Sequence, residues 1–214
     1  MASPLREPSL LHRTLTQHPH TVTSASGSYL HLSDGRTILD ACGGAAVSIL
    51  GHSNPEVIAA TLTQMQAVSY VHTGSYTTRS AEDLAHAVLA PHSGFQHGLA
   101  KAFFVGSGSE ANDAAMKCAR QYWFEKGEMQ RTRYVARRQG YHGNTIGAMS
   151  VSSVLGRKVP YDDILMGNVG FVAPADEFHG RRIGESEGKF VKRLVREVEE
   201  EFLRTGPETI ISFM

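Results

Sequence analysis

The sequence contains only two cysteines, Cys42 and Cys118, which lie far apart and form no CxxC pair. This scarcity excludes a disulfide framework and predicts two reduced thiols in the core of an intracellular protein. An excess of charge of one sign is also lacking, since 21 basic residues balance 21 acidic ones. A nucleic-acid partner usually requires a basic excess or stripe, so none is predicted.

Three further absences narrow the class of protein. No apolar run reaches the roughly 18 residues of a membrane-spanning helix, so no membrane partner is predicted. The 11 histidines lack acids or cysteines at ligand spacing, so no metal site is predicted. No Gly-Lys-Ser/Thr follows a glycine-rich loop, which excludes a Walker-type nucleotide site.

The remaining composition, 41% hydrophobic and 20% charged, is typical of a soluble globular protein of one or two domains. The cytoplasm is the predicted location. A mitochondrial location is the alternative, because Arg6 and Arg13 stand among serines and threonines near the N-terminus.

The first part of the chain indicates a small antiparallel element followed by helices. Residues 21–41 alternate between apolar and polar, and Ser26-Gly27 and Asp34-Gly35 interrupt them as turns. Asn54 before Pro55 predicts a helix over 55–68, and a second helix is expected to start at Ser80.

From residue 101 onward, strands and helices are predicted to alternate. Strands are expected at 102–105, 134–136, 169–173 and 209–213, and helices at 109–126, 144–154 and 188–204. The last helix shows an apolar stripe formed by Val191, Leu194, Val195, Val198 and Phe202. Such alternation predicts an α/β fold with a parallel sheet, and the four strands leave that sheet incomplete.

The junction at Gly106-Ser107-Gly108-Ser109-Glu110-Ala111-Asn112 predicts a phosphate site. A strand that turns into a helix presents free N–H groups and the positive end of the helix dipole at one point. Glycines allow a close approach, and Ser107 and Ser109 can add hydroxyl donors. Gly106-x-Gly108-x-x-Ala111 also fits a dinucleotide fingerprint, so an NAD(P)-binding oxidoreductase is an alternative.

A second motif, Tyr141-His142-Gly143-Asn144-Thr145, follows the next predicted strand and so falls at the same end of the sheet. An aromatic ring there can stack on a flat heteroaromatic ligand whose phosphate lies at the first helix N-terminus.

Together these motifs resemble the class III family of pyridoxal-phosphate-dependent aminotransferases, which have fold type I. The resemblance covers nearly the whole chain but only the N-terminal half of the family's pattern. Besides the two motifs above, it includes Asp34-Gly35-Arg36, Ile38-Leu39-Asp40, Gly43-Gly44 and Leu50-Gly51-His52.

The resemblance implies pyridoxal 5′-phosphate (PLP) as cofactor. Ser107, Gly108 and Ser109 match the loop that binds the cofactor phosphate. Tyr141 matches the aromatic residue that stacks on the pyridine ring, and His142 shapes its loop. Residues 1–54 would be the N-terminal arm and hairpin of a small domain, and residues 55–214 the first part of the large PLP-binding domain. The resemblance further implies a homodimer, an amino donor and a 2-oxo acid acceptor.

The catalytic residues of the family are not assigned within this chain. Transamination needs a Schiff-base lysine and an aspartate at the pyridine nitrogen. None of the lysines stands in the family's lysine context, and each is predicted to lie on a solvated surface: Lys101, Lys117, Lys126, Lys158, Lys189 and Lys192. The chain alone is therefore expected to be inactive. It is either a piece of a transaminase or a non-catalytic relative that binds PLP or a homologue.

Overall fold

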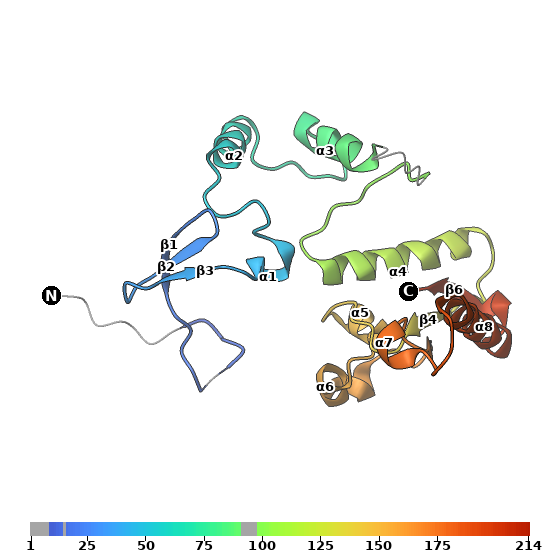
Figure 1. Cartoon of the computed structure of the whole chain (residues 1–214). Helices are drawn as coiled ribbons and strands as arrows, with labels where there is room; N and C mark the ends of the chain where they lie inside the picture. The colour runs from blue at the N-terminus through green and yellow to red at the C-terminus, as the bar shows by residue number, and fades with distance from the viewer. Residues whose placement is uncertain (1–8, 15, 91–97) are drawn as a thin grey trace. The chain divides into compact units, whose positions relative to one another are not determined.

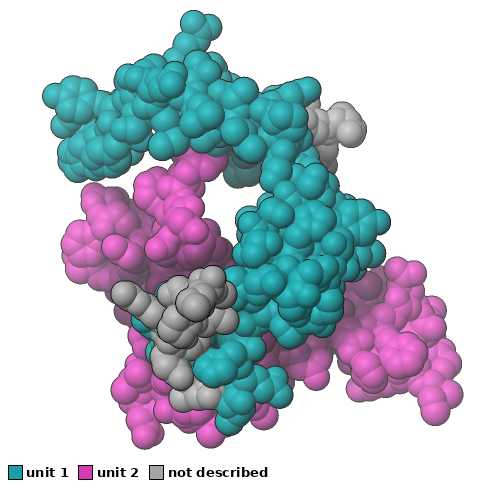
Figure 2. All heavy atoms as spheres, turned by 90° about the vertical axis from the view of Figure 1, so that its left-hand side faces the viewer, with its two compact units in different colours: residues 1–101 teal, residues 102–214 magenta. Residues whose placement is uncertain are grey.

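The computed structural model describes residues 9–14, 16–90 and 98–214. Its backbone contacts divide the chain into two compact units, Met1–Lys101 and Ala102–Met214, which are coloured separately in Figure 2. This division after Lys101 differs from the predicted domain boundary after residue 54, which stays a prediction. The first eight residues of the predicted N-terminal arm lie outside the described residues.

The first unit contains a three-stranded antiparallel sheet. Strands β1 (Val22–Ser26), β2 (Tyr29–Leu32) and β3 (Thr37–Leu39) pair in chain order. Gly35 closes the second hairpin with a positive φ of 86°, and its N–H donates to the carbonyl of Leu32 at 3.1 Å. The predicted antiparallel element is confirmed.

The helices of the first unit begin at caps that the sequence makes recognisable. After the short α1 (Gly43–Ala46), helix α2 (Pro55–Ala67) starts behind Asn54, whose side chain accepts from the N–H groups of Glu56 and Val57. Helix α3 (Arg79–Leu89) starts behind Thr78. Among the described residues of this unit, Leu32 is the one buried hydrophobic side chain, so its core is small.

The second unit is a parallel sheet with helices on both faces (Figure 1). Its strand order is β5 (Val169–Val172), β4 (Arg133–Arg137), β6 (Ile210–Phe213), and β4 pairs in parallel with both neighbours. The long helices are α4 (Gly108–Glu125) and α8 (Glu187–Thr205). Shorter elements are α5 (Ile146–Val151), α6 (Leu155–Lys158), η1 (Val159–Ile164), α7 (Glu177–Gly180) and η2 (Pro207–Thr209).

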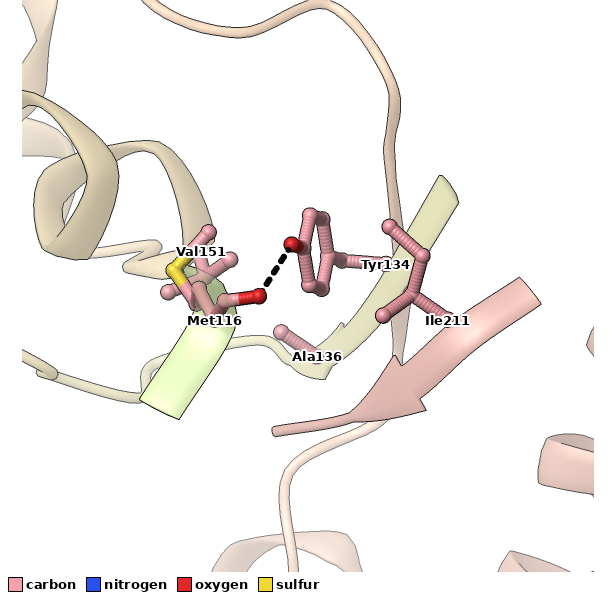
Figure 3. Packing of buried hydrophobic residues seen from close by; sticks show 5 residues of the cluster. All are labelled: Met116, Tyr134, Ala136, Val151 and Ile211. Carbon is pink, nitrogen blue, oxygen red and sulfur yellow. Dashed lines mark hydrogen bonds between the residues drawn. The ribbon is translucent and has the colours of Figure 1, made fainter. Parts of the chain in front are cut away.

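The central strand β4 supplies both layers of the core, because its side chains alternate between the two faces of the sheet. Tyr134 and Ala136 pack with Ile211 against Met116 of α4 and Val151 of α5, as Figure 3 shows. Val135 points to the other face, where the partly buried side chains of α8 pack. The predicted α/β fold with an incomplete parallel sheet is confirmed.

The predicted strand over residues 102–105 is wrong, because these residues form no strand. Their apolar composition favours extended backbone, but a strand needs a neighbour for its N–H and C=O groups, and none pairs with these residues within the described chain. Phe103 is 80% exposed. The segment that leads into α4 therefore has no strand partner within the described chain.

Two side-chain predictions were also wrong. Cys42 and Cys118 are free thiols as expected, but both are exposed rather than in the core. On α8, Leu194 is buried, whereas Val191 and Val195 are exposed and Phe190 is buried in their place. The buried face of α8 therefore differs from the predicted apolar stripe: it includes Phe190 and leaves out Val191 and Val195.

Within the described residues, no helix is both long and apolar enough to cross a membrane. The same part of the chain brings together no group of three histidine, cysteine or acidic side chains that could hold a metal ion.

The buried hydroxyl of Tyr134 allows a test of this core. It donates to the carbonyl of Met116 at 2.9 Å, and burial raises its pKa. Tyr134→Phe removes the bond and leaves that carbonyl with one partner fewer, so we expect a loss of about 1 kcal/mol in the free energy of unfolding. Urea denaturation followed by circular dichroism measures it. Tyr122→Phe is the control, because Tyr122 is exposed on α4, the helix that carries Met116. It should change the free energy of unfolding by less than about 0.5 kcal/mol.

Candidate functional site

Helix α4 begins with a reciprocal cap that accounts for Glu110. The Ser107 hydroxyl oxygen accepts from the N–H of Glu110 at 3.2 Å, and the Glu110 carboxylate accepts from the N–H of Gly106 at 2.7 Å. This is the capping-box arrangement, with the carboxylate bonded one residue further out than usual. Glu110 therefore serves the helix terminus, a role that the sequence left unassigned.

The cap leaves the donors between Gly106 and Glu110 available. The N–H groups of Gly108 and Ser109 form no hydrogen bond among the described residues, as expected for the first helical positions. The oxygens of Ser107 and Ser109 each accept a backbone N–H, so their hydroxyl protons remain free to donate. Two N–H groups and two O–H groups are thus available as donors at the positive end of the helix dipole.

The loop that follows β4 meets this helix terminus directly. The N–H of Asn144 donates to the Ser109 hydroxyl at 3.0 Å, and the Thr145 hydroxyl donates to the Ser109 carbonyl at 3.4 Å. A Cβ at Gly143 would stand 2.5 Å from the Ser109 hydroxyl oxygen and 2.8 Å from its Cα, which is closer than real contacts allow. The two predicted motifs are therefore in contact, and Gly143 is the residue that permits it.

The side chain of Asn112 makes a second connection between the two segments. Its amide nitrogen donates to the carbonyl of Gly108 at 3.1 Å and to the carbonyl of His142 at 2.6 Å. On the other side of the loop, the N–H of His142 donates to the Ser152 hydroxyl at 2.8 Å. The backbone of His142 is consequently held by α4 and by the end of α5 together.

Tyr141 and His142 lie in different environments within this loop. Tyr141 is 52% exposed, and the guanidinium of Arg157 lies over one face of its ring, 4.9 Å from the centroid. His142 is partly buried, and this burial lowers its pKa and so favours the neutral imidazole. Arg157 has no signal in the sequence, because it comes from the short helix α6 rather than from either motif.

The lysines differ from their prediction at one position. Lys101, Lys117, Lys126, Lys189 and Lys192 are exposed, as expected for a solvated surface. Lys158 is partly buried instead, and its ammonium donates to the carbonyls of Ser150 at 3.0 Å and Ser152 at 3.1 Å. Burial lowers its pKa, but both carbonyl bonds give it a structural role.

The parallel sheet and the donor-rich helix terminus define an α/β protein whose candidate site suits a phosphorylated ligand with a flat ring. The family model for class-III aminotransferases matches residues 11–210. The chain belongs to the class-III aminotransferase family, whose cofactor is pyridoxal 5′-phosphate.

Individual relatives agree with the family match. An uncharacterised aminotransferase of Schizosaccharomyces pombe is 41% identical over 96% of this chain and 44% of its own length. Gamma-aminobutyrate transaminase 1, mitochondrial, of Oryza sativa subsp. japonica is 33% identical over 92% of this chain and 38% of its own. The chain thus spans less than half the length of these relatives.

A solved structure shares the fold. The omega transaminase of Pseudomonas jessenii, in complex with PMP, superposes with a TM-score of 0.83 at 29% identity. The superposition covers 91% of this chain and 42% of that one. The dinucleotide fingerprint needs a strand before Gly106, as the phosphate-site prediction also did, and residues 102–105 form none.

The contact at Gly143 can be tested by substitution. In Gly143→Ala the added methyl group meets the Ser109 backbone, and the φ of 141° disfavours any side chain. We expect the loop to be pushed away from α4 and the free energy of unfolding to fall by about 1–3 kcal/mol, measured by urea denaturation.

Gly188→Ala is the matched control, because a Cβ there meets nothing within 4 Å on helix α8. This control should gain up to about 1 kcal/mol from its better helix propensity. Unchanged stability of Gly143→Ala would show that the loop does not touch α4.

Proposed function

We propose that this chain carries the phosphate- and ring-binding part of a PLP-dependent transaminase. The observation that carries the proposal is the contact between the N-terminus of α4 and the loop 141–145. The first supplies unpaired donors for a dianionic phosphate. The second carries Tyr141 next to His142, whose carbonyl is bonded to Asn112 of that helix. A phosphate at a helix N-terminus beside a stacking ring is the combination that PLP requires.

Each residue has a distinct part in this proposal. The N–H groups of Gly108 and Ser109 and the hydroxyls of Ser107 and Ser109 bind the phosphate oxygens. Tyr141 stacks on the pyridine with the ring face opposite Arg157, and Arg157 adds positive charge beside the tyrosine. His142 shapes the loop, and the burial that lowers its pKa disfavours a positive charge there.

When bound, PLP supplies the electron sink through which an amino group passes from a donor to a 2-oxo acid acceptor. The chain's own residues bind and orient the cofactor for this reaction. We assign no Schiff-base lysine and no pyridine-nitrogen aspartate among the 214 residues, so we expect this chain alone not to transaminate. The second candidate function is a non-catalytic relative that binds PLP or a homologue.

The amino donor is an amino acid or an amine, and the complete protein would act as a homodimer. The cytoplasm remains the proposed location. A mitochondrial location is the alternative, and the rice relative carries that compartment in its name.

Binding of vitamin B6 compounds tests the phosphate site directly. Pyridoxamine 5′-phosphate is the suitable probe because, unlike an aldehyde, it cannot react with surface lysines. Calorimetry should show at least about tenfold tighter binding of this compound than of pyridoxamine, since charge-assisted hydrogen bonds contribute about 1.5–3 kcal/mol each.

Two variants sharpen that experiment. Ser109→Ala removes a phosphate donor together with the acceptor of the Asn144 N–H, so it should weaken binding of the phosphorylated compound about tenfold and that of pyridoxamine less. Ser186→Ala removes the cap of α8 in the same unit and should leave both affinities unchanged. Equal affinity of the wild-type chain for the two compounds would refute the phosphate site.

Borohydride reduction of the native protein from its source tests the assignment of the lysine. Reduction converts a Schiff base into a permanent lysine adduct, which intact-mass measurement detects. We expect the adduct on a polypeptide well above 23.3 kDa, the mass of this chain, if the active enzyme is longer. A 23.3 kDa polypeptide without an adduct would favour the non-catalytic relative. An adduct on a 23.3 kDa polypeptide would contradict the expected inactivity.

A further inference from the structure

Asn112 lies between the two halves of the proposed cofactor site. Its amide nitrogen bonds the carbonyl of Gly108, in the phosphate-binding turn, and the carbonyl of His142, next to Tyr141. Only an N–H group can serve two carbonyl oxygens, so the orientation of this amide is fixed by its partners. Among the described residues, no other side chain bonds the His142 carbonyl.

We propose that Asn112 is a positioning residue that couples the phosphate-binding turn to the ring of Tyr141. This inference rests on the proposed function and deepens it. Because Ser152 holds the N–H of His142 and Asn112 holds its carbonyl, the backbone next to Tyr141 is fixed on both sides. The ring is then set at a constant position relative to the phosphate donors of α4.

The chemistry of the position explains why the residue is an amide. An aspartate of the same size would place a carboxylate against two carbonyl oxygens and close to a phosphate. All of these groups are acceptors or anions, so the connection would become repulsive. An alanine would keep the helix, since its helix propensity exceeds that of asparagine, and would lose both bonds.

A double-mutant cycle measures the coupling. Binding of pyridoxamine 5′-phosphate and of inorganic phosphate is compared by calorimetry for the wild type, Asn112→Ala, Tyr141→Ala and the double variant. Asn112→Ala should weaken binding of the vitamin compound about tenfold and that of inorganic phosphate less than about twofold, because only the ring contact is displaced. The double variant should be about as weak as either single variant rather than about a hundredfold weaker.

Two further variants complete the design. Asn112→Asp, which cannot donate at neutral pH, should bind the vitamin compound more weakly than Asn112→Ala. Asn168→Ala is the matched control: its amide also donates to a backbone carbonyl, that of Thr132, but it lies before β5 and so at the opposite end of the sheet. This control should leave both affinities unchanged.

Several results would overturn the inference. Fully additive losses in the double variant would mean that Asn112 and Tyr141 act independently. An equal loss of both ligands in Asn112→Ala would mean that Asn112 serves the helix terminus alone, and an unaffected Tyr141→Ala would mean that there is no ring contact to position. A wild-type chain that binds neither compound would refute the proposed function itself, which is a distinguishable outcome.

Discussion

The pairing of β4 with a strand on each side is the constraint on which the second unit depends. Tyr134, Val135 and Ala136 are all buried, and they contribute to two cores on opposite faces of the sheet. A strand held in this way has little freedom at its ends. The start of the loop that follows its carboxyl end is therefore fixed in position. Helix α4 packs on the same strand through Met116, and its first turn contacts that loop.

The site adds a second set of constraints to this frame. Capping bonds fix the start of α4, and the bonds of Ser109 and Asn112 fix the loop against it. All of these bonds join groups of the chain itself. The turn that carries the proposed phosphate donors is therefore held in place by the protein's own contacts.

Much of the fold was predictable because its signals are local. Asn54 before Pro55 marks the start of α2, Asp34-Gly35 marks a hairpin, and the alternation of apolar segments marks the parallel sheet. Residues 102–105 show the limit, since an apolar segment becomes a strand only if another strand pairs with it. The exposure of Val195 and the carbonyl bonds of Lys158 depend on tertiary packing, which no local pattern encodes. The site residues named from the motifs stay predictions. No role could be proposed for Asn112 and Arg157 from the sequence, because their contacts with His142 and Tyr141 join residues that are distant in the chain.

Trp123 is the single tryptophan of the chain, and its surroundings make it a natural optical probe. Its indole N–H donates to the carbonyl of Ile211 at 2.8 Å, and the guanidinium of Arg131 lies 3.9 Å from its ring centroid. The first contact requires the last strand to lie beside α4, and Arg131 itself donates to the carbonyls of Pro207 and Ile210. Indole emission responds to polarity and to nearby charge, so its wavelength and intensity report whether β6 is docked. The docking of the edge strand β6 can therefore be followed by the intrinsic fluorescence of Trp123, without an added label.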